Sequence, residues 1–243
     1  EILNKNVRLE QLRQQVRHLE RSYSNKESTA VPIGIQKLDN CLSSKGLCLG
    51  RVHEIINSEN TGVEDAAPLG FVIALLTRVL NAANQNKRVI WCSSKKKILN
   101  SRLSAAGLYW LGFDPNQLIQ ANVLSEIDQY WVMEECLKCS ELAAVVVELA
   151  NTKPHSKNQE SIAWRRFQLA AESSGVTGFV VRSHNNGIKT TNSIPESRWG
   201  VTSLPSNDWR PMWKLELLRS RNGKCFSADV VWNPATASFS LPS

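Results

Sequence analysis

The chain has 243 residues, of which 42% are hydrophobic, and it carries a formal net charge of +7. This length and composition suit one globular domain with an appendage. No apolar run approaches about 18 residues, so we expect no membrane-spanning helix, and no basic-then-apolar start indicates secretion.

The six cysteines lie mostly among apolar residues, which favours a reduced cytosol and therefore a cytoplasmic protein. Cys136 and Cys139 form a lone CxxC pair, without a second pair at the spacing of a zinc site. Ordinary packing on a helix is the favoured interpretation of this pair, ahead of a metal or redox role. We expect no bound metal.

Residues 1–24 carry apolar side chains at spacings near three and four, with Arg and Gln between them. The pattern predicts an amphipathic helix whose apolar stripe includes Leu12, Val16 and Leu19. The next six residues, NKESTA, contain no apolar anchor and should form a linker. A tethered helix of this kind commonly docks on a partner, on a second copy or on its own core.

A strand, a polar loop and a helix follow one another in residues 50–84. The strand is the apolar run at 52–56, and the helix is marked by apolar residues at three-to-four spacing. This succession is the layout of a phosphate-binding loop.

The residues of that loop do not fit its usual chemistry. The pattern G-x-x-x-x-G-K-[ST] needs glycines that let backbone N–H groups close round phosphate oxygens, a lysine for the terminal phosphates and a hydroxyl for Mg²⁺. Of these, Gly62 alone survives. Asn57 stands at the first glycine, Val63 at the lysine and Glu64 at the hydroxyl. Glu64 and the aspartate after it would satisfy the helix dipole and repel a triphosphate, so we expect no bound nucleotide.

Predicted strands and helices alternate along the rest of the chain. Further strands are predicted at 89–92, 118–121, 143–149 and 176–181. Helices are predicted at 35–42, 99–112, 128–140 and 161–174. The part after residue 196 is interpreted as one strand plus a hairpin turned at Asn222-Gly223. This order predicts an α/β domain over 31–243 with an open, mostly parallel sheet and helices on both faces, preceded by the helix and linker over 1–30.

The tryptophans divide into two groups. Four are predicted to pack in the core, because they lie among aliphatic residues in predicted strands or helices: Trp91, Trp110, Trp131 and Trp164. Trp199, Trp209 and Trp213 lie beside Arg198, Arg210 and Lys214. For this second group core packing and surface recognition stay open, since an exposed aromatic next to a cation suits protein and nucleic-acid contacts alike.

The charge is unevenly distributed. Residues 161–243 hold ten basic and five acidic side chains, whereas residues 31–160 hold thirteen of each. The excess in the last third points to an acidic partner, either nucleic acid or an acidic protein surface. A solvated basic face that aids solubility is the alternative.

Five sequence blocks carry a resemblance to known proteins. They are IGIQKLDNCLSSKGLCLGRVHEI at 33–55, TGVEDAAPLGF at 61–71, WRRFQLAAESSGVTGFVVR at 164–182, SRWGVTSLPS at 197–206 and WKLELLRSRNG at 213–223. The first resembles the start of a RecA-like recombinase core. The others resemble the ImuA family of bacterial damage-inducible mutagenesis proteins. Together they are specific and span most of residues 31–232, and they imply a RecA-like core with C-terminal antiparallel strands.

Three positions bear on whether the chain is an active RecA-type ATPase. Val63 stands where the phosphate-binding lysine would be, and Ser93 or Ser94 where the residue that activates the attacking water would follow the second strand. Glu148 keeps the Walker B carboxylate that would help to hold Mg²⁺. Without the lysine, the hydroxyl and the base, the resemblance implies no ATPase activity.

Two loops would line the DNA path of a RecA protein, at 151–159 and 184–196. Their main cations are Lys153, Lys157 and Lys189, and they contain no aromatic residue. Because high-affinity single-strand binding combines phosphate contacts with stacking groups, only weak, salt-sensitive DNA contact is expected. Arg198, Arg210, Trp209 and Trp213 are further candidates for DNA or partner contact.

The resemblance implies a noncatalytic adaptor in SOS-induced translesion DNA synthesis. Its partners would be ImuB and an error-prone DNA polymerase, with RecA or a second copy joined through the N-terminal helix. Two alternatives stay open. One is an ATP-binding RecA-like ATPase that acts on single-stranded DNA, because backbone N–H groups alone can hold phosphate. The other is a cell-division inhibitor resembling SulA.

Overall fold

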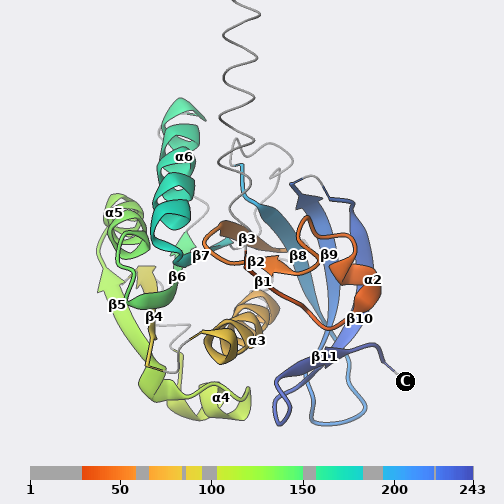
Figure 1. The fold of residues 1–243 in the computed structure, drawn as a ribbon. Coiled ribbons are helices and arrows are strands. Elements are labelled where there is room, and N and C mark those ends of the chain that lie inside the picture. Colours follow the sequence, from red (N-terminus) through yellow and green to blue (C-terminus); the bar gives the residue numbers. More distant parts are fainter. Residues whose placement is uncertain are drawn as a thin grey trace, which may run out of the picture.

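The computed structural model describes residues 29–58, 66–83, 86–94, 103–149, 157–182, 194–221 and 223–242. Within these ranges the chain forms a large mixed sheet, a two-stranded sheet and helices (Figure 1). The helices are α2 (Gln36–Asp39), α3 (Ala67–Ala82), α4 (Ala105–Trp110), the 3-10 turn η1 (Pro115–Gln117), α5 (Glu126–Leu137) and α6 (Lys157–Ser174). The strands are β1 (Ala30–Val31), β2 (Leu47–Cys48), β3 (Val52–Asn57), β4 (Arg88–Ser94), β5 (Leu118–Val123), β6 (Leu142–Leu149), β7 (Thr177–Arg182), β8 (Ser197–Leu204), β9 (Met212–Ser220), β10 (Phe226–Asn233) and β11 (Ser238–Ser240).

The large sheet has nine strands in the order β11-β10-β9-β8-β3-β7-β6-β4-β5. β3 pairs in parallel with β7 on one side and with β8 on the other. From β8 to β5 every pairing is parallel, whereas β9, β10 and β11 extend the sheet in antiparallel fashion. The predicted α/β class with a mostly parallel sheet and C-terminal antiparallel strands is confirmed, while the finer assignment to a RecA-like core stays a prediction.

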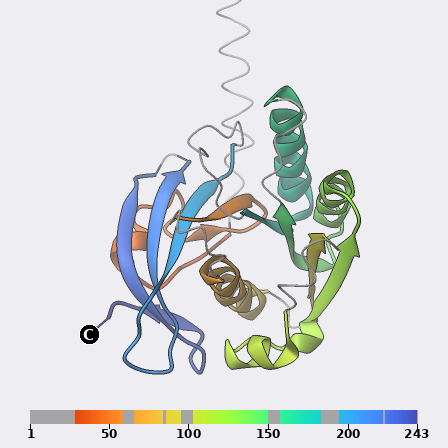
Figure 2. The ribbon, with the colours of Figure 1, turned by 180° about the vertical axis from the view of Figure 1, so that it is seen from behind.

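Helices cover both faces of the sheet, as Figures 1 and 2 show. α3 packs into a core with β3, β6, β8, β9 and β10, and Phe71 of α3 touches the rings of Trp199 and Trp213. α5 and α6 pack against the other face through Met133, Trp164 and other apolar residues. β6 lies between the two cores, which explains its uninterrupted apolar sequence.

Local signals set several element ends. Ser125 and Asp128 form a capping box at the start of α5, so the helix begins two residues before the predicted 128. Gly112 has a φ of +83°, and a Cβ there would collide with the carbonyl of Pro234. The predicted glycine stop is therefore confirmed, although the described helix before it spans six residues only.

The C-terminal part differs from its prediction. The predicted hairpin is present as β9 and β10, paired around Leu217 and Phe226. A further strand, β11, pairs with the end of β10 and was not predicted. With three residues it is too short for period-2 alternation to reveal it.

Five of the seven assessed tryptophans agree with the sequence analysis, because Trp199, Trp209 and Trp213 were left open between core and surface. Trp91 and Trp164 are buried as predicted, and Trp209 is 59% exposed. The prediction was wrong for Trp110, which is 49% exposed, and for Trp131, which is 66% exposed. Trp131 falls opposite the stripe that α5 buries through residues 129, 133 and 137, and α4 buries only Leu108.

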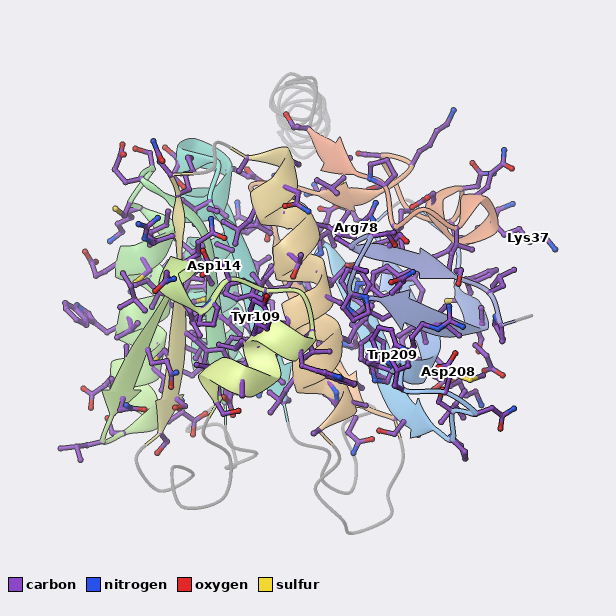
Figure 3. All side chains as sticks on the ribbon, turned by 90° about the horizontal axis from the view of Figure 1, so that it is seen from below. Lys37, Arg78, Tyr109, Asp114, Asp208 and Trp209 are labelled. Carbon is purple, nitrogen blue, oxygen red and sulfur yellow. The ribbon has the colours of Figure 1, made fainter. Side chains whose placement is uncertain are left out.

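Arg78 of α3 joins the two ends of the described domain. Its Nε and Nη2 donate to the carbonyl of Pro32 at 3.1 and 2.6 Å, and its Nη1 donates to the carbonyl of Ala237 at 2.7 Å. Figure 3 shows Arg78 beside α3, between the first strands and the last. One side chain therefore fixes a segment that precedes β2 and a turn that precedes β11.

Among the residues described, none of the helices combines the length and the apolar character that crossing a membrane requires.

Candidate functional site at the strand ends

The carboxyl ends of the parallel strands meet at one edge of the sheet, which is where ligands of open α/β sheets bind. β3 ends at Asn57, β6 at Leu149 and β7 at Arg182. The loop with Gly62, Val63 and Glu64 follows β3 but lies outside the described residues. The site is therefore built from the strands and helices around that loop.

A buried charge cluster joins β3, β7, β8 and α6. Arg182 Nε donates to Glu54 Oε1 at 2.8 Å, and Arg182 Nη2 donates to Glu160 Oε1 at 2.5 Å. Arg198 Nε donates to Glu54 Oε2 at 2.5 Å. Glu54 is 0% exposed, and Arg182 and Glu160 are almost as deeply buried. We call these four residues the buried charge cluster.

The electrostatics of the buried charge cluster are nearly balanced. Two guanidinium groups face two carboxylates, so each charge removed from water has a partner of opposite sign. Burial alone would lower the pKa of Arg182, but the charges of Glu54 and Glu160 outweigh it and raise that pKa above its usual value. Burial also raises the pKa of Tyr130, whose hydroxyl lies near Arg182. Arg182 is therefore a cation whose charge is neutralised by carboxylates of the same protein.

Glu148, the carboxylate predicted at the Walker B position, is 2% exposed. It accepts a hydrogen bond from the indole Nε1 of Trp91 at 2.5 Å, across the β4–β6 pair. Gln129 of α5 donates to its backbone carbonyl at 2.6 Å. The Glu148 carboxylate is therefore hydrogen-bonded to Trp91 on the face of the sheet that α3 covers.

The start of the phosphate-loop segment is held close to β8. The N–H of Ser58 donates to the carbonyl of Val201 at 3.3 Å, and a Cβ on Gly200 would collide with the Ser58 hydroxyl. Asn57 is 5% exposed and lies opposite Val201 in the parallel pairing. Glycine at 200 permits this close approach.

His53 is buried in a separate polar chain on the α3 face of β3. Its Nε2 lies 2.9 Å from the carbonyl of Cys48 and its Nδ1 2.7 Å from the Ser197 hydroxyl. Because the carbonyl can only accept, Nε2 carries the hydrogen, and Ser197 donates to Nδ1 while accepting from Trp199 Nε1 at 2.7 Å. Burial lowers the pKa of His53 to about 4, so it is a neutral structural residue.

The structure does not bring the predicted contact residues together. Arg198 belongs to the buried charge cluster, so its side chain is tied to Glu54. Trp213 is 4% exposed and packs on Phe71 and Phe239, which corrects its assignment as a contact residue. Its place in β9 faces the α3 core, because β9 buries alternate residues.

Trp209 and Arg210 lie in the loop between β8 and β9, which Figure 3 shows beside α4. Trp209 meets Trp110 of α4 edge to face at a ring distance of 6.4 Å. Arg210 forms an ion pair with Asp208 at 2.6 Å. The loop and α4 therefore together present an exposed aromatic pair, and the adjacent charges of Asp208 and Arg210 are paired with each other.

The remaining predicted residues cannot be placed. Leu12, Val16 and Leu19 of the docking helix lie outside the described residues, as do Lys153 and Lys189. Lys157 is the first residue of α6, and its side chain also lies outside that part. Within the described ranges, no group of three or more His, Cys, Asp or Glu residues is arranged to hold a metal ion.

Sequence reasoning missed Glu54, Glu160 and Arg182. A glutamate inside the apolar run VHEII and an arginine at the end of GFVVR were the available signals. Charged residues inside strands that helices cover are almost always paired. The sequence alone could not say with which residue, since Glu54 and Arg182 are 128 positions apart.

The fold and the site define an α/β protein with a mostly parallel sheet, in which the buried charge cluster beside the phosphate-loop strand is paired internally. A scan against protein-family models finds no match. The chain is 29% identical over 208 residues to Protein ImuA of Caulobacter vibrioides, strains NA1000 / CB15N and CB 15, covering 79% of this chain and 78% of each relative. This similarity confirms the resemblance to the ImuA family.

Proposed function

We propose that the chain is a noncatalytic adaptor of SOS-induced translesion DNA synthesis, which acts in the bacterial cytoplasm by joining ImuB to an error-prone DNA polymerase. The similarity to Protein ImuA points to damage-inducible mutagenesis. The single observation that supports an adaptor over an ATPase is the buried charge cluster. Its two arginines are held by Glu54 and Glu160.

The chemistry of phosphoryl transfer explains why that observation matters. Catalysis rests on cations aimed at the transferred group and on a metal held by a carboxylate. Here Val63 replaces the lysine, and Arg182 and Arg198 neutralise buried carboxylates. Glu148 accepts from Trp91. The two arginines beside the phosphate-loop strand and the Walker B carboxylate thus bond to other groups of the protein.

Titration calorimetry with ATP and Mg²⁺ tests the noncatalytic part. We expect the heat to equal that of dilution, as in a parallel titration with buffer. A saturating signal at micromolar ATP would overturn this part and favour the alternative of an ATP-binding protein.

Co-purification tests the adaptor part. Tagged protein should retain both ImuB and the polymerase when the three are mixed, and should link them when neither binds the other directly. A variant lacking residues 1–24, checked for folding by circular dichroism, shows whether the predicted helix serves one of these contacts. Failure of the full chain to retain either partner would refute the adaptor.

A further inference from the structure

Five exposed cationic residues lie on the β9–β10 hairpin and on the stretch from α2 to β2 that this hairpin contacts. We name this set the basic patch: Lys37, Lys45, Arg219, Arg221 and Lys224. In Figure 1 the α2 end of the molecule lies beside β9 and β10, on the opposite side from α5, and Figure 3 shows Lys37 projecting from it. Segments far apart in the sequence thus contribute to one surface.

The hairpin is fixed to the residue that follows α2. The N–H of Lys224 donates to the carbonyl of Cys41 at 3.0 Å, and the thiol of Cys41 reaches back to the carbonyl of Lys37. A Cβ on Gly223 would collide with the same Cys41 carbonyl, so glycine is required for this approach. Lys37 and Lys224 are therefore held on neighbouring backbone.

A second set of bonds places Arg221 and Lys45. The N–H of Arg221 donates to the carbonyl of Glu196 at 2.9 Å, and the carboxylate of Glu196 accepts from the Ser43 hydroxyl at 3.0 Å. Lys45 follows in the same turn, where its N–H donates to Leu42 and its φ of +54° is left-handed. Hydrogen bonds within the protein therefore hold the backbone that carries these residues of the basic patch.

The cations of the basic patch are poorly neutralised within the described residues. One ion pair reaches it there, between Arg221 and Glu196 at 4.0 Å, and the Arg221 side chain remains 53% exposed. The nearby Asp39 is buried and accepts from the N–H groups of Ile33 and Gly34. Several like charges held together cost free energy unless an anion offsets them.

We propose that the basic patch binds the phosphate backbone of duplex DNA. Protein interfaces are centred on buried aromatic or apolar anchors and exclude charge from their core. The patch offers one exposed large apolar neighbour, Leu218 at 44%. Nucleic-acid interfaces are polar and strongly positive, which matches these side chains better than an acidic protein does.

The composition of the patch favours duplex over single-stranded DNA. Binding to single strands without sequence preference relies on aromatic rings that stack on the bases, and none of the five residues is aromatic. A duplex also carries about twice the charge per unit length of a single strand. Cations without stacking groups should therefore bind the duplex more tightly.

Fluorescence anisotropy with a labelled mixed-sequence duplex, repeated over a salt series, tests this proposal. With up to five phosphate contacts, the slope of log K against log salt should be about −4.5, so that a fourfold rise in salt weakens binding roughly 500-fold. The variant Arg219→Gln/Arg221→Gln/Lys224→Gln should bring the slope to about −2. Circular dichroism and a thermal melt confirm that the variant folds.

A matched triple variant controls for net charge. Arg88→Gln/Lys138→Gln/Arg165→Gln removes the same number of charges from β4, the end of α5 and α6, away from the basic patch. We expect its duplex affinity to stay within about twofold of the unmodified chain. Equal losses in both variants would refute a localised site.

Competition experiments separate the other sources of negative charge. An unlabelled single strand that competes better than the duplex would overturn the proposal, and so would polyglutamate that binds the patch while the duplex does not. None of these measurements involves nucleotide, ImuB or polymerase. The proposal therefore stands or falls independently of the adaptor function.

Discussion

The arginines of the buried charge cluster are paired with carboxylates, whereas those of the basic patch are exposed to solvent. In the cluster, Arg182 and Arg198 meet Glu54 and Glu160 at 2.5 to 2.8 Å. In the basic patch, cations lie together with one described ion pair at 4.0 Å among them. The two positive and two negative charges of the cluster cancel, so the cluster adds nothing to the net charge of +7.

The difference shows where charge serves folding and where it is available for binding. Interior ions must be paired because desolvation is costly, and removing one partner leaves the other exposed to that cost. Exposed cations contribute little to stability because water and salt screen them. Stability measurements should respond to the first region, and binding measurements to the second.

The largest effect is expected from Arg182→Met. The substitution leaves Glu54 and Glu160 buried without their shared partner, which should lower the free energy of unfolding by about 3–5 kcal/mol. Urea denaturation followed by circular dichroism measures the loss.

Arg166→Met is the matched control for that experiment. Arg166 also pairs with a glutamate, Glu134 at 2.6 Å, but its side chain is 62% exposed. We expect a loss below about 1 kcal/mol. Equal losses for the two variants would contradict the distinction between interior and surface charges.

A smaller, pH-dependent effect is expected from His53. Its folded pKa of about 4 lies below the ordinary histidine value of 6.5, so the unfolded chain takes up a proton first as the pH falls. Stability is therefore lost from about pH 6.5 down to about pH 4, by about 2 kcal/mol at pH 5. In His53→Gln this component should disappear.

Urea denaturation at pH 7 and pH 5 measures that component as the difference between the two chains. Carboxylates titrate in both proteins, so their contribution cancels. The same pH dependence in both chains would mean that His53 is not buried as a neutral ring.

The smallest effect on stability per residue is expected from Arg219→Gln/Arg221→Gln/Lys224→Gln. Because these side chains are exposed and mostly unpaired, the free energy of unfolding should change by no more than about 0.5 kcal/mol per residue. Urea denaturation in low salt checks this. A loss as large as that of Arg182→Met would mean that the patch holds the hairpin in place.

Much of the fold could be predicted because its signals are local. The uninterrupted apolar run of β6 predicted a strand buried on both faces, and Gly112 predicted a helix end. Which face of a short or weakly amphipathic helix points to the core could not be predicted as well. Trp110 and Trp131 each have apolar neighbours in sequence, yet the turn of the helix directs them to solvent.

The candidate site was predictable only at the level of single residues. The substitutions at Val63 and Glu64 are visible in the sequence, but the pairing of Glu54 with Arg182 depends on two strands meeting in register. The basic patch was hidden for the same reason. Lys37 and Lys224 lie 187 positions apart, and only the fold of the hairpin onto Cys41 brings them together.

The contacts of Arg78 affect the order in which parts of the domain can fold during synthesis. Because this side chain holds both Pro32 and Ala237, its set of hydrogen bonds is complete only after residue 237 has left the ribosome. Chains emerge at about 5–20 residues per second, and their early parts can fold first. The bond to Ala237 should therefore be the last of these contacts to form, and a chain that stops before residue 237 would keep the bonds from Arg78 to Pro32 and lose that one.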